Sequence, residues 1–280
     1  MKVKFISFCL AGLLVSSAWS ETVQVNDVEM HYEVTGMGPP LLLLHGFGST
    51  GSDSWTSVAT ELAGDFQVIL PDLRGHGRST NPSQEFTHRQ SALDVFGLLD
   101  HLGLEQVQAM GISTGGMTLL HMATQQPERL EAMILIGATI YFPEQAREIL
   151  RNLDPTAVPE DRMEEMRVRH AYGDEQILML ERQFSAFKDS YDDMNFTAPY
   201  LSTISARTLI VHGDRDRFFP AHIALEMYEA IPDSYLWLVP NGGHVPIRGP
   251  RQDHFLCTAT AFLNDEWQSG GPGVQPKLCN

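Results

Sequence analysis

Short apolar runs separated by stretches of helical periodicity recur along this chain and limit the folds that it can adopt. The run Leu41–Leu44 contains no polar residue, as in a strand buried on both faces of a parallel sheet. Residues 92–102 instead place their apolar side chains on one helical face. Further strands are expected at 66–70, 107–111, 132–136, 208–211 and 235–239, after a strand pair at 22–26 and 28–34. Strands joined by helices imply right-handed crossovers, so we expect an α/β fold with a mostly parallel, eight-stranded sheet flanked by helices.

One segment interrupts this alternation. Residues 142–202 contain amphipathic stretches but no convincing strand. We expect them to form a helical lid inserted into a core made of residues 21–141 and 203–265. The larger apolar side chains of this segment are expected to pack a subsidiary core rather than to line a pocket; they are Met163, Met166, Ile177, Met179, Leu180, Phe184, Phe187 and Met194. The glycine-rich end, 266–280, is expected to be a flexible tail.

The first twenty residues have the pattern of a secretory signal. Lys2 and Lys4 precede an apolar run, residues 5–15, and the segment ends in Ala18-Trp19-Ser20 before Glu21. The run is too short for a membrane span, which needs about 20 residues. We therefore expect cleavage near Ser20 and export of a periplasmic or secreted protein, with no stable membrane insertion.

Two of the three cysteines lie outside this leader, which holds Cys9. An oxidising compartment would permit a disulfide between Cys257 and Cys279. Cys257 falls on the polar face of the last expected helix, where the tail can reach it. The alternative is a pair of free thiols.

The net charge and the absence of certain motifs exclude some kinds of partner and cofactor. A formal net charge of -16 repels phosphate backbones, so nucleic acid is not expected as a partner. The chain contains no H-E-x-x-H or C-x-x-C spacing, so we expect neither a metal nor another cofactor. Nothing in the sequence indicates an oligomeric state.

The strand at 107–111 runs directly into Gly111-Ile112-Ser113-Thr114-Gly115, which opens a helix. This G-x-S-x-G pattern in a strand, turn and helix context is typical of an exposed nucleophilic serine. The flanking glycines are needed because the turn is tight and strained. Ser113 is therefore the candidate nucleophile.

A serine hydroxyl needs a general base, and the base needs an orienting carboxylate. His244 follows the last expected strand, at the sheet edge where the nucleophile should lie, whereas most of the other histidines fall in expected helices or the lid. The loop after the strand at 208–211 offers two carboxylates, Asp214 and Asp216. Both are also typical turn residues, so the sequence alone does not choose between them.

The negative charge of a tetrahedral intermediate requires two backbone amides directed at one point. The amide of Thr114 is one candidate, since it follows the nucleophile at a helix N-terminus. The amide of Phe47 is the other, in the loop His45-Gly46-Phe47-Gly48 after the buried strand.

Together these segments resemble the α/β-hydrolase superfamily over residues 40–263. The specific matches are the His45–Gly48 loop, Asp72–Ser79, Gly111–Gly115 and Gly213-Asp214-x-Asp216 followed by Gly243-His244. The resemblance implies that Asp216 is the acid of the triad, while Asp214 is structural. It also implies that His76 is not catalytic. Relatives that open epoxides or displace halides carry an aspartate in place of Ser113, so those activities are disfavoured.

We therefore expect a serine hydrolase of the carboxylesterase type that cleaves an ester of a small, apolar substrate through an acyl-enzyme. The aromatic residues flanking the motifs agree with an apolar pocket; they are Phe47, Tyr141, Phe142, Phe218 and Phe219. Lactone opening, carbon-carbon bond hydrolysis or cofactor-free perhydrolysis at the same triad are the alternatives. A catalytically silent binding protein on the same scaffold is a further one.

Overall fold

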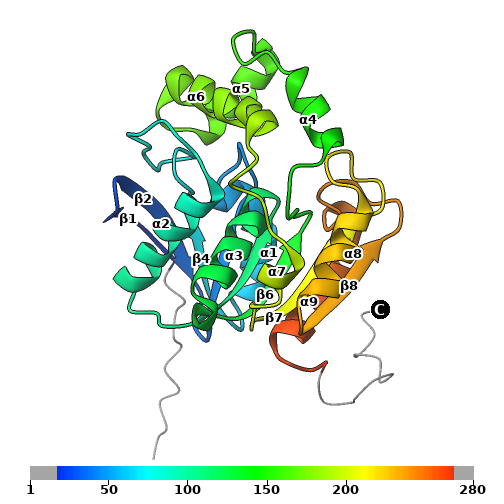
Figure 1. Ribbon diagram of the computed structural model, residues 1–280. Coiled ribbons are helices and arrows are strands. Elements are labelled where there is room, and N and C mark those ends of the chain that lie inside the picture. Colours follow the sequence, from blue (N-terminus) through cyan, green and yellow to red (C-terminus); the bar gives the residue numbers. More distant parts are fainter. Residues whose placement is uncertain (1–17, 268–280) are drawn as a thin grey trace, which may run out of the picture.

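Eight strands form a single sheet in the order β1-β2-β4-β3-β5-β6-β7-β8 in the computed structural model, which describes residues 18–267 (Figure 1). Strands β3 to β8 pair in parallel, whereas β2 is antiparallel to both β1 and β4. The strands are β1 Trp19–Val25, β2 Val28–Thr35, β3 Pro40–Leu44, β4 Gln67–Pro71, β5 Val107–Ile112, β6 Leu130–Ile136, β7 Arg207–Gly213 and β8 Ser234–Val239. The α/β class and the mostly parallel, eight-stranded sheet are thus confirmed.

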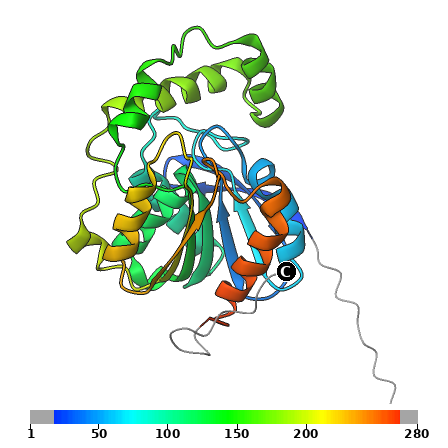
Figure 2. The same cartoon turned by 90° about the vertical axis from the view of Figure 1, so that its right-hand side faces the viewer.

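Helices cover both faces of the sheet (Figures 1 and 2). One face carries α1 (Gly51–Leu62) and α9 (Gln252–Leu263), and the other carries α2 (His88–His101), α3 (Thr114–Gln125) and α8 (Ala221–Ala230). Short 3₁₀ helices at Pro127–Arg129 and Gly249–Arg251 complete the core.

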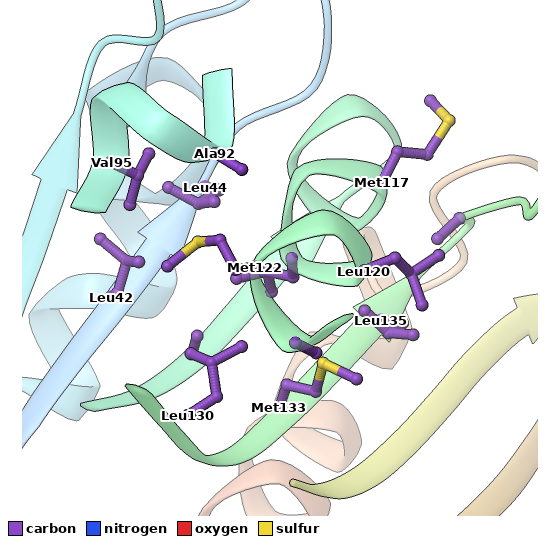
Figure 3. Packing of buried hydrophobic residues seen from close by; sticks show 14 of the residues in the cluster. Leu42, Leu44, Ala92, Val95, Met117, Leu120, Met122, Leu130, Met133 and Leu135 are labelled. Atoms are coloured by element: carbon purple, nitrogen blue, oxygen red, sulfur yellow. The ribbon is translucent and has the colours of Figure 1, made fainter. Parts of the chain in front are cut away.

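Strand β3 is apolar throughout because both of its faces are covered. Leu42 and Leu44 pack with residues of α2 and α3 (Figure 3), while Leu41 and Leu43 pack with those of α1 and α9. All four leucines are fully buried. Since each buried leucine contributes about 1.5–3 kcal/mol, this short strand anchors the loop that follows it.

Four helices and a 3₁₀ turn lie between β6 and β7, where the sequence predicts an insertion. They are α4 Glu144–Arg151, α5 Glu160–Arg169, α6 Gly173–Ala186, the turn Phe187–Asp189 and α7 Ala198–Leu201. We call residues 142–202 the helical insertion. Its helices α4, α5 and α6 group together at the top of the molecule in Figures 1 and 2. A small core inside it contains Met163, Met166, Ile177, Met179 and Leu180.

A buried carboxylate attaches the end of the insertion to the core. Asp193 accepts hydrogen bonds from the backbone amides of His88 and Arg89, at the start of α2, and from Nδ1 of His88 at 2.6 Å. Burial alone would raise the pKa of Asp193, but these hydrogen bonds and the nearby His88 lower it to about 2. The ionised carboxylate therefore stabilises the attachment.

Asp193→Asn is expected to lower the free energy of unfolding by about 2–3 kcal/mol at pH 7, from the difference between a pKa of about 2 in the folded state and about 3.9 in the unfolded chain. Because the folded pKa is depressed, this contribution is present above about pH 4 and is lost as the pH falls toward 2. Urea unfolding of both proteins at pH 7 and pH 3 measures it. If the free energies of unfolding of the two proteins differ equally at both pH values, the ionised carboxylate is not the source of the stabilisation.

Two predicted features reach the limits of the described chain. Strand β1 begins at Trp19, one residue before the end of the predicted leader, and residues 1–17 lie outside the described region. Of the predicted tail, 268–280 also lie outside, whereas Trp267 packs edge-on against Phe262 with ring centroids 5.4 Å apart. Between residues 18 and 267, no helix combines the length and apolarity needed to cross a bilayer.

Cys257 is exposed on α9 and takes part in a disulfide. Its exposure agrees with the face assigned to it from the sequence. Cys279, the predicted partner, lies outside the described residues, so the pairing stays a prediction.

Candidate active site

Ser113 occupies the turn between β5 and α3 in a strained conformation. Its φ of 50° and ψ of -113° place it in a region that non-glycine residues rarely adopt. Its amide donates a hydrogen bond to the carbonyl of Ile136 on the neighbouring strand β6, at 2.8 Å. This bond fixes the turn to the sheet and leaves the side chain half-buried at the wall of a cavity.

The glycines on either side of Ser113 are explained by close backbone contacts. A Cβ atom on Gly111 would lie 2.4 Å from backbone atoms of Gly115 and Gly116. One on Gly115 would lie 2.3 Å from the carbonyl oxygen of Leu44 on β3. Since backbone cannot move aside as a flexible side chain can, only glycine fits at these two positions.

The structure brings the three predicted catalytic side chains together. Nε2 of His244 lies 3.0 Å from Oγ of Ser113, and Nδ1 of His244 lies 2.8 Å from Oδ2 of Asp216. Ser113 follows β5, Asp216 follows β7 and His244 follows β8. Because these parallel strands end at the same edge of the sheet, residues far apart in sequence meet in one hydrogen-bonded chain.

Asp216 is held in its ionised form. Burial raises its pKa, but the hydrogen bond and charge of His244 and the amides of Phe218 and Phe219 together lower the pKa below its usual value. Those two amides donate to Oδ1, at 2.7 and 3.2 Å, which leaves Oδ2 for His244. An ionised Oδ2 accepts the Nδ1 proton, so Nε2 of His244 faces Ser113 as a proton acceptor.

Asp214, the second acid of this loop, has a different position. Its Oδ1 accepts a hydrogen bond from the amide of Gly242 at 3.2 Å, and its side chain is exposed. The contact joins the loop after β7 to the loop that carries His244. Asp214 is therefore placed to support this loop and does not contact His244 through a hydrogen bond in the described structure.

The loop after β3 packs against the turn at Ser113. A Cβ atom on Gly46 would lie 3.8 Å from Cβ of Ser113, and Phe47, Ser113 and Thr114 line the same cavity. Thr114 is the first residue of α3, so no carbonyl of a preceding helical turn is available to its amide. Phe47 and Thr114 thus both belong to segments that adjoin the nucleophile, and the use of their amides as an oxyanion site stays a prediction.

Three buried histidines beneath this loop have structural contacts. Nε2 of His45 accepts the amide proton of Leu73 at 2.8 Å, and His76 packs edge-on against the ring of Phe47. His170, at the end of α5, accepts from the amide of Gly77. Burial lowers the pKa of all three, to about 4 for His170, so they are neutral at pH 7. They support the loop rather than supply a base.

A cavity of about 300 Å³ opens next to Ser113 and His244. Its lining includes aromatic and aliphatic side chains, namely Met117, Phe142, Ala146, Leu150, Phe184, Phe187, Phe218 and Phe219. It also includes polar and charged residues, namely Ser49, Asp53, Ser54, Arg162, Glu165, Arg169 and Arg248. A bound molecule therefore meets both apolar and polar groups near the nucleophile.

Several of these wall residues were missed by the sequence analysis. The expectation that the large side chains of the insertion only pack a subsidiary core is wrong for Phe184 and Phe187, which line the cavity and pack around Phe47. Conversely, Tyr141 was named among the pocket aromatics but is not in the cavity wall; its hydroxyl donates to Glu226. No group of three or more His, Cys, Asp or Glu side chains placed to hold a metal ion occurs within residues 18–267.

The fold and the site define a hydrolase of the α/β-hydrolase class. A sequence model described as alpha/beta hydrolase fold matches residues 39–247, and the chain belongs to this family.

Individual relatives cover most of the chain. It is 28% identical over 245 residues to the human protein named serine hydrolase BPHL, a match spanning 84% of this chain and 83% of that one. It is 29% identical over 273 residues to 2-hydroxy-6-oxo-6-phenylhexa-2,4-dienoate hydrolase of Comamonas testosteroni, spanning 85% and 92%. A solved thermophilic esterase from Thermogutta terrifontis aligns with a TM-score of 0.69 at 25% identity, covering 88% of this chain and 98% of the esterase.

Proposed function

We propose that this protein is a serine hydrolase that cleaves carboxylic esters through an acyl-enzyme on Ser113. The observation that carries the proposal is the continuous chain of hydrogen bonds from Asp216 through His244 to Ser113, which ends in a cavity of about 300 Å³. This arrangement supplies a nucleophile, a base and an orienting acid at one point.

In the first step, Nε2 of His244 takes the proton of Ser113 while Oγ attacks the carbonyl carbon of the ester. The negative charge that develops on the carbonyl oxygen is stabilised by the amides of Phe47 and Thr114. Asp216 stabilises the imidazolium of His244 at a distance of 2.8 Å.

In the second step, His244 donates this proton to the leaving alcohol, and an acyl group remains on Oγ of Ser113. A water molecule then gives a proton to His244 and attacks the acyl carbon. The acid leaves as the proton returns to Ser113, so each cycle consumes one water and restores the enzyme.

The cavity supports a small substrate with an apolar part. The rings of Phe47, Phe142, Phe187 and Phe219 surround the space beside the nucleophile, which suits an alkyl or aryl group of modest length. We propose further that the protein is exported, a proposal supported by the pattern of residues 1–20 alone.

Carbon-carbon bond hydrolysis at the same triad is the second candidate. It is favoured by the similarity over 85% of the chain to the hydrolase of C. testosteroni named above. Lactone opening and perhydrolysis use the same residues and stay alternatives.

A substrate panel tests the proposal. We expect turnover of p-nitrophenyl acetate, butanoate and octanoate, with covalent labelling of Ser113 by a fluorophosphonate detected by peptide mass. We expect decay of 2-hydroxy-6-oxo-6-phenylhexa-2,4-dienoate, followed by its absorbance, to be slower. If the dienoate is cleaved faster than every ester, carbon-carbon bond hydrolysis replaces ester hydrolysis as the proposed function. If Ser113 is not labelled, the alternative of a catalytically silent binding protein replaces it.

A further inference from the structure

His212 is a buried histidine near the end of β7, and its side chain reaches across the loop that carries Asp216. It lies four residues before Asp216, its side chain is fully buried, and it is not among the described residues that line the cavity. Nε2 of His212 lies 2.8 Å from the carbonyl oxygen of Phe219, on the far side of Asp216 in the same loop. Because a carbonyl oxygen only accepts hydrogen bonds, this contact places the ring proton on Nε2.

The ring of His212 is neutral at pH 7. Burial lowers its pKa below the usual value and outweighs the hydrogen bond to Phe219 and the charge of Asp216, which raise it, while His244 lowers it further. Nε2 of His212 lies 3.8 Å from Oδ2 of Asp216, too far for a hydrogen bond, so Oδ2 stays available to His244 at 2.8 Å. His212 therefore neither replaces His244 as the base nor competes with it for the carboxylate.

Phe219 connects His212 to the triad. Its carbonyl accepts from His212, and its amide donates to Oδ1 of Asp216 at 3.2 Å, beside the amide of Phe218 at 2.7 Å. Its ring packs edge-on against the imidazole of His244, with ring centroids 5.3 Å apart. One residue of this loop is thus held by a buried side chain of β7 and in turn contacts both the acid and the base of the triad.

We propose that His212 is a positioning residue of the triad: its Nε2–H fixes Phe219, and thereby the direction in which Asp216 presents Oδ2. This inference rests on the proposed function, because it concerns the same triad. Two amides can orient a carboxylate only if the backbone that carries them is itself held in place. A displacement of about 1 Å at a reacting group can lower a rate about a hundredfold. His212 acts through Asp216 and does not contact the substrate.

Three substitutions that differ in their N–H donor test the inference. His212→Met fills the space without a donor. His212→Gln carries its amide nitrogen as many bonds from Cα as Nε2 of histidine, whereas the nitrogen of His212→Asn is one bond nearer to the backbone and falls short of Phe219. We expect kcat for p-nitrophenyl butanoate to fall about tenfold to a hundredfold in the Met and Asn variants and to stay within about threefold of wild type in the Gln variant.

A second rate separates the triad from the choice of substrate. The second-order rate constant for labelling of Ser113 by a fluorophosphonate depends on the triad but not on the natural substrate, and the labelling endpoint counts the active sites. Because His212 lies behind the triad and not in the cavity wall, kcat and the labelling rate per active site should fall together, while KM changes less than about threefold. The comparison of Asn with Gln decides the matter if His212→Met does not fold.

His121→Met is the matched control. His121 is also buried, its Nε2 lies 2.8 Å from the carbonyl oxygen of Asp193, and it is not among the described residues that line the cavity. Its replacement removes the same kind of hydrogen bond away from the triad. Both rates should stay within about threefold of wild type.

A double variant shows whether His212 acts through Asp216. When His212→Met is added to Asp216→Asn, the labelling rate should fall less than about twofold further, because the carboxylate that His212 orients is already lost. The inference is overturned by unchanged rates in the Met and Asn variants, by equal losses in the Met and Gln variants, by a rise of KM alone, or by an undiminished loss in the double variant.

The labelling rate also keeps the two proposals apart. A wild type that is labelled but cleaves no ester overturns ester hydrolysis and leaves the comparison of labelling rates among the His212 variants to decide the inference. A wild type that is not labelled at Ser113 overturns both.

Discussion

Ser113→Ala is expected to lower kcat for p-nitrophenyl butanoate by about 10⁴- to 10⁶-fold, the largest effect of any single substitution in this protein. Without Oγ no acyl-enzyme can form, and His244 has no hydroxyl to deprotonate at its 3.0 Å contact. The remaining turnover would come from the oxyanion amides and the binding of substrate, which Ala leaves in place. Steady-state kinetics with an active-site titration of the wild type measure the loss.

Ser91→Ala is the matched control for this variant. Ser91 on α2 is fully buried and its hydroxyl has no partner, but it does not line the cavity. Its replacement should leave kcat unchanged. The assignment of Ser113 fails if its alanine variant keeps more than about one hundredth of the activity, since a triad serine contributes far more than that.

Asp216→Asn is expected to lower kcat by about 10³- to 10⁴-fold while leaving the fold intact. The contacts of the loop determine how the amide orients. The amides of Phe218 and Phe219 donate to the Oδ1 position, so an asparagine oxygen is retained there and its NH₂ group points to Nδ1 of His244. An amide that donates to Nδ1 places the imidazole proton on Nε2, and the ring can no longer accept the proton of Ser113.

The neighbouring acid supplies the control for Asp216→Asn. Asp214→Asn keeps an oxygen for the amide of Gly242, so its kcat should fall less than about tenfold. Because the pKa of Asp216 is lowered in the folded protein, its charge stabilises the fold above about pH 4, and this contribution is lost as the pH falls. Asp216→Asn should therefore cost more stability in urea at pH 7 than at pH 3. Equal activity losses for the two asparagine variants would contradict the assignment of Asp216.

The strands and the turn at Ser113 could be predicted because their causes are local. A strand covered on both faces must be apolar, and the turn at Ser113 excludes side chains at Gly111 and Gly115 because of backbone 2.3–2.4 Å away. Each of these requirements can be recognised from a segment of a few residues. The meeting of Ser113 with His244 then follows from the parallel direction of the strands that precede them.

The choice between Asp214 and Asp216 was not local. Two aspartates in one loop look alike in sequence, and the resemblance to the family was needed to prefer the second. The structure gives the physical difference, since Asp216 is buried and receives two backbone amides in addition to His244, while Asp214 is exposed.

The walls of the cavity could not be predicted because they depend on contacts between distant segments. Phe184 and Phe187 reach the site because two contacts hold the insertion in place. Asp193 bonds to His88 on α2, 105 residues earlier in the sequence, and His170 bonds to Gly77 in the loop after β4, 93 residues earlier. In the sequence, Asp193 follows another aspartate and looks like a solvated charge. No local pattern marks either residue as an attachment point.

The proposed catalytic residues lie in the core, whereas part of the cavity wall lies in residues 142–202, and this separation has a consequence for how the protein can evolve. The residues that we propose to break the bond follow β5, β7 and β8, whereas Ala146, Leu150, Phe184 and Phe187 belong to one uninterrupted stretch that leaves after β6 and returns before β7. Mutation or recombination within that stretch alters which molecules fit without displacing the machinery that attacks them. Substrate range and chemical competence can therefore drift separately during evolution, each under its own selection.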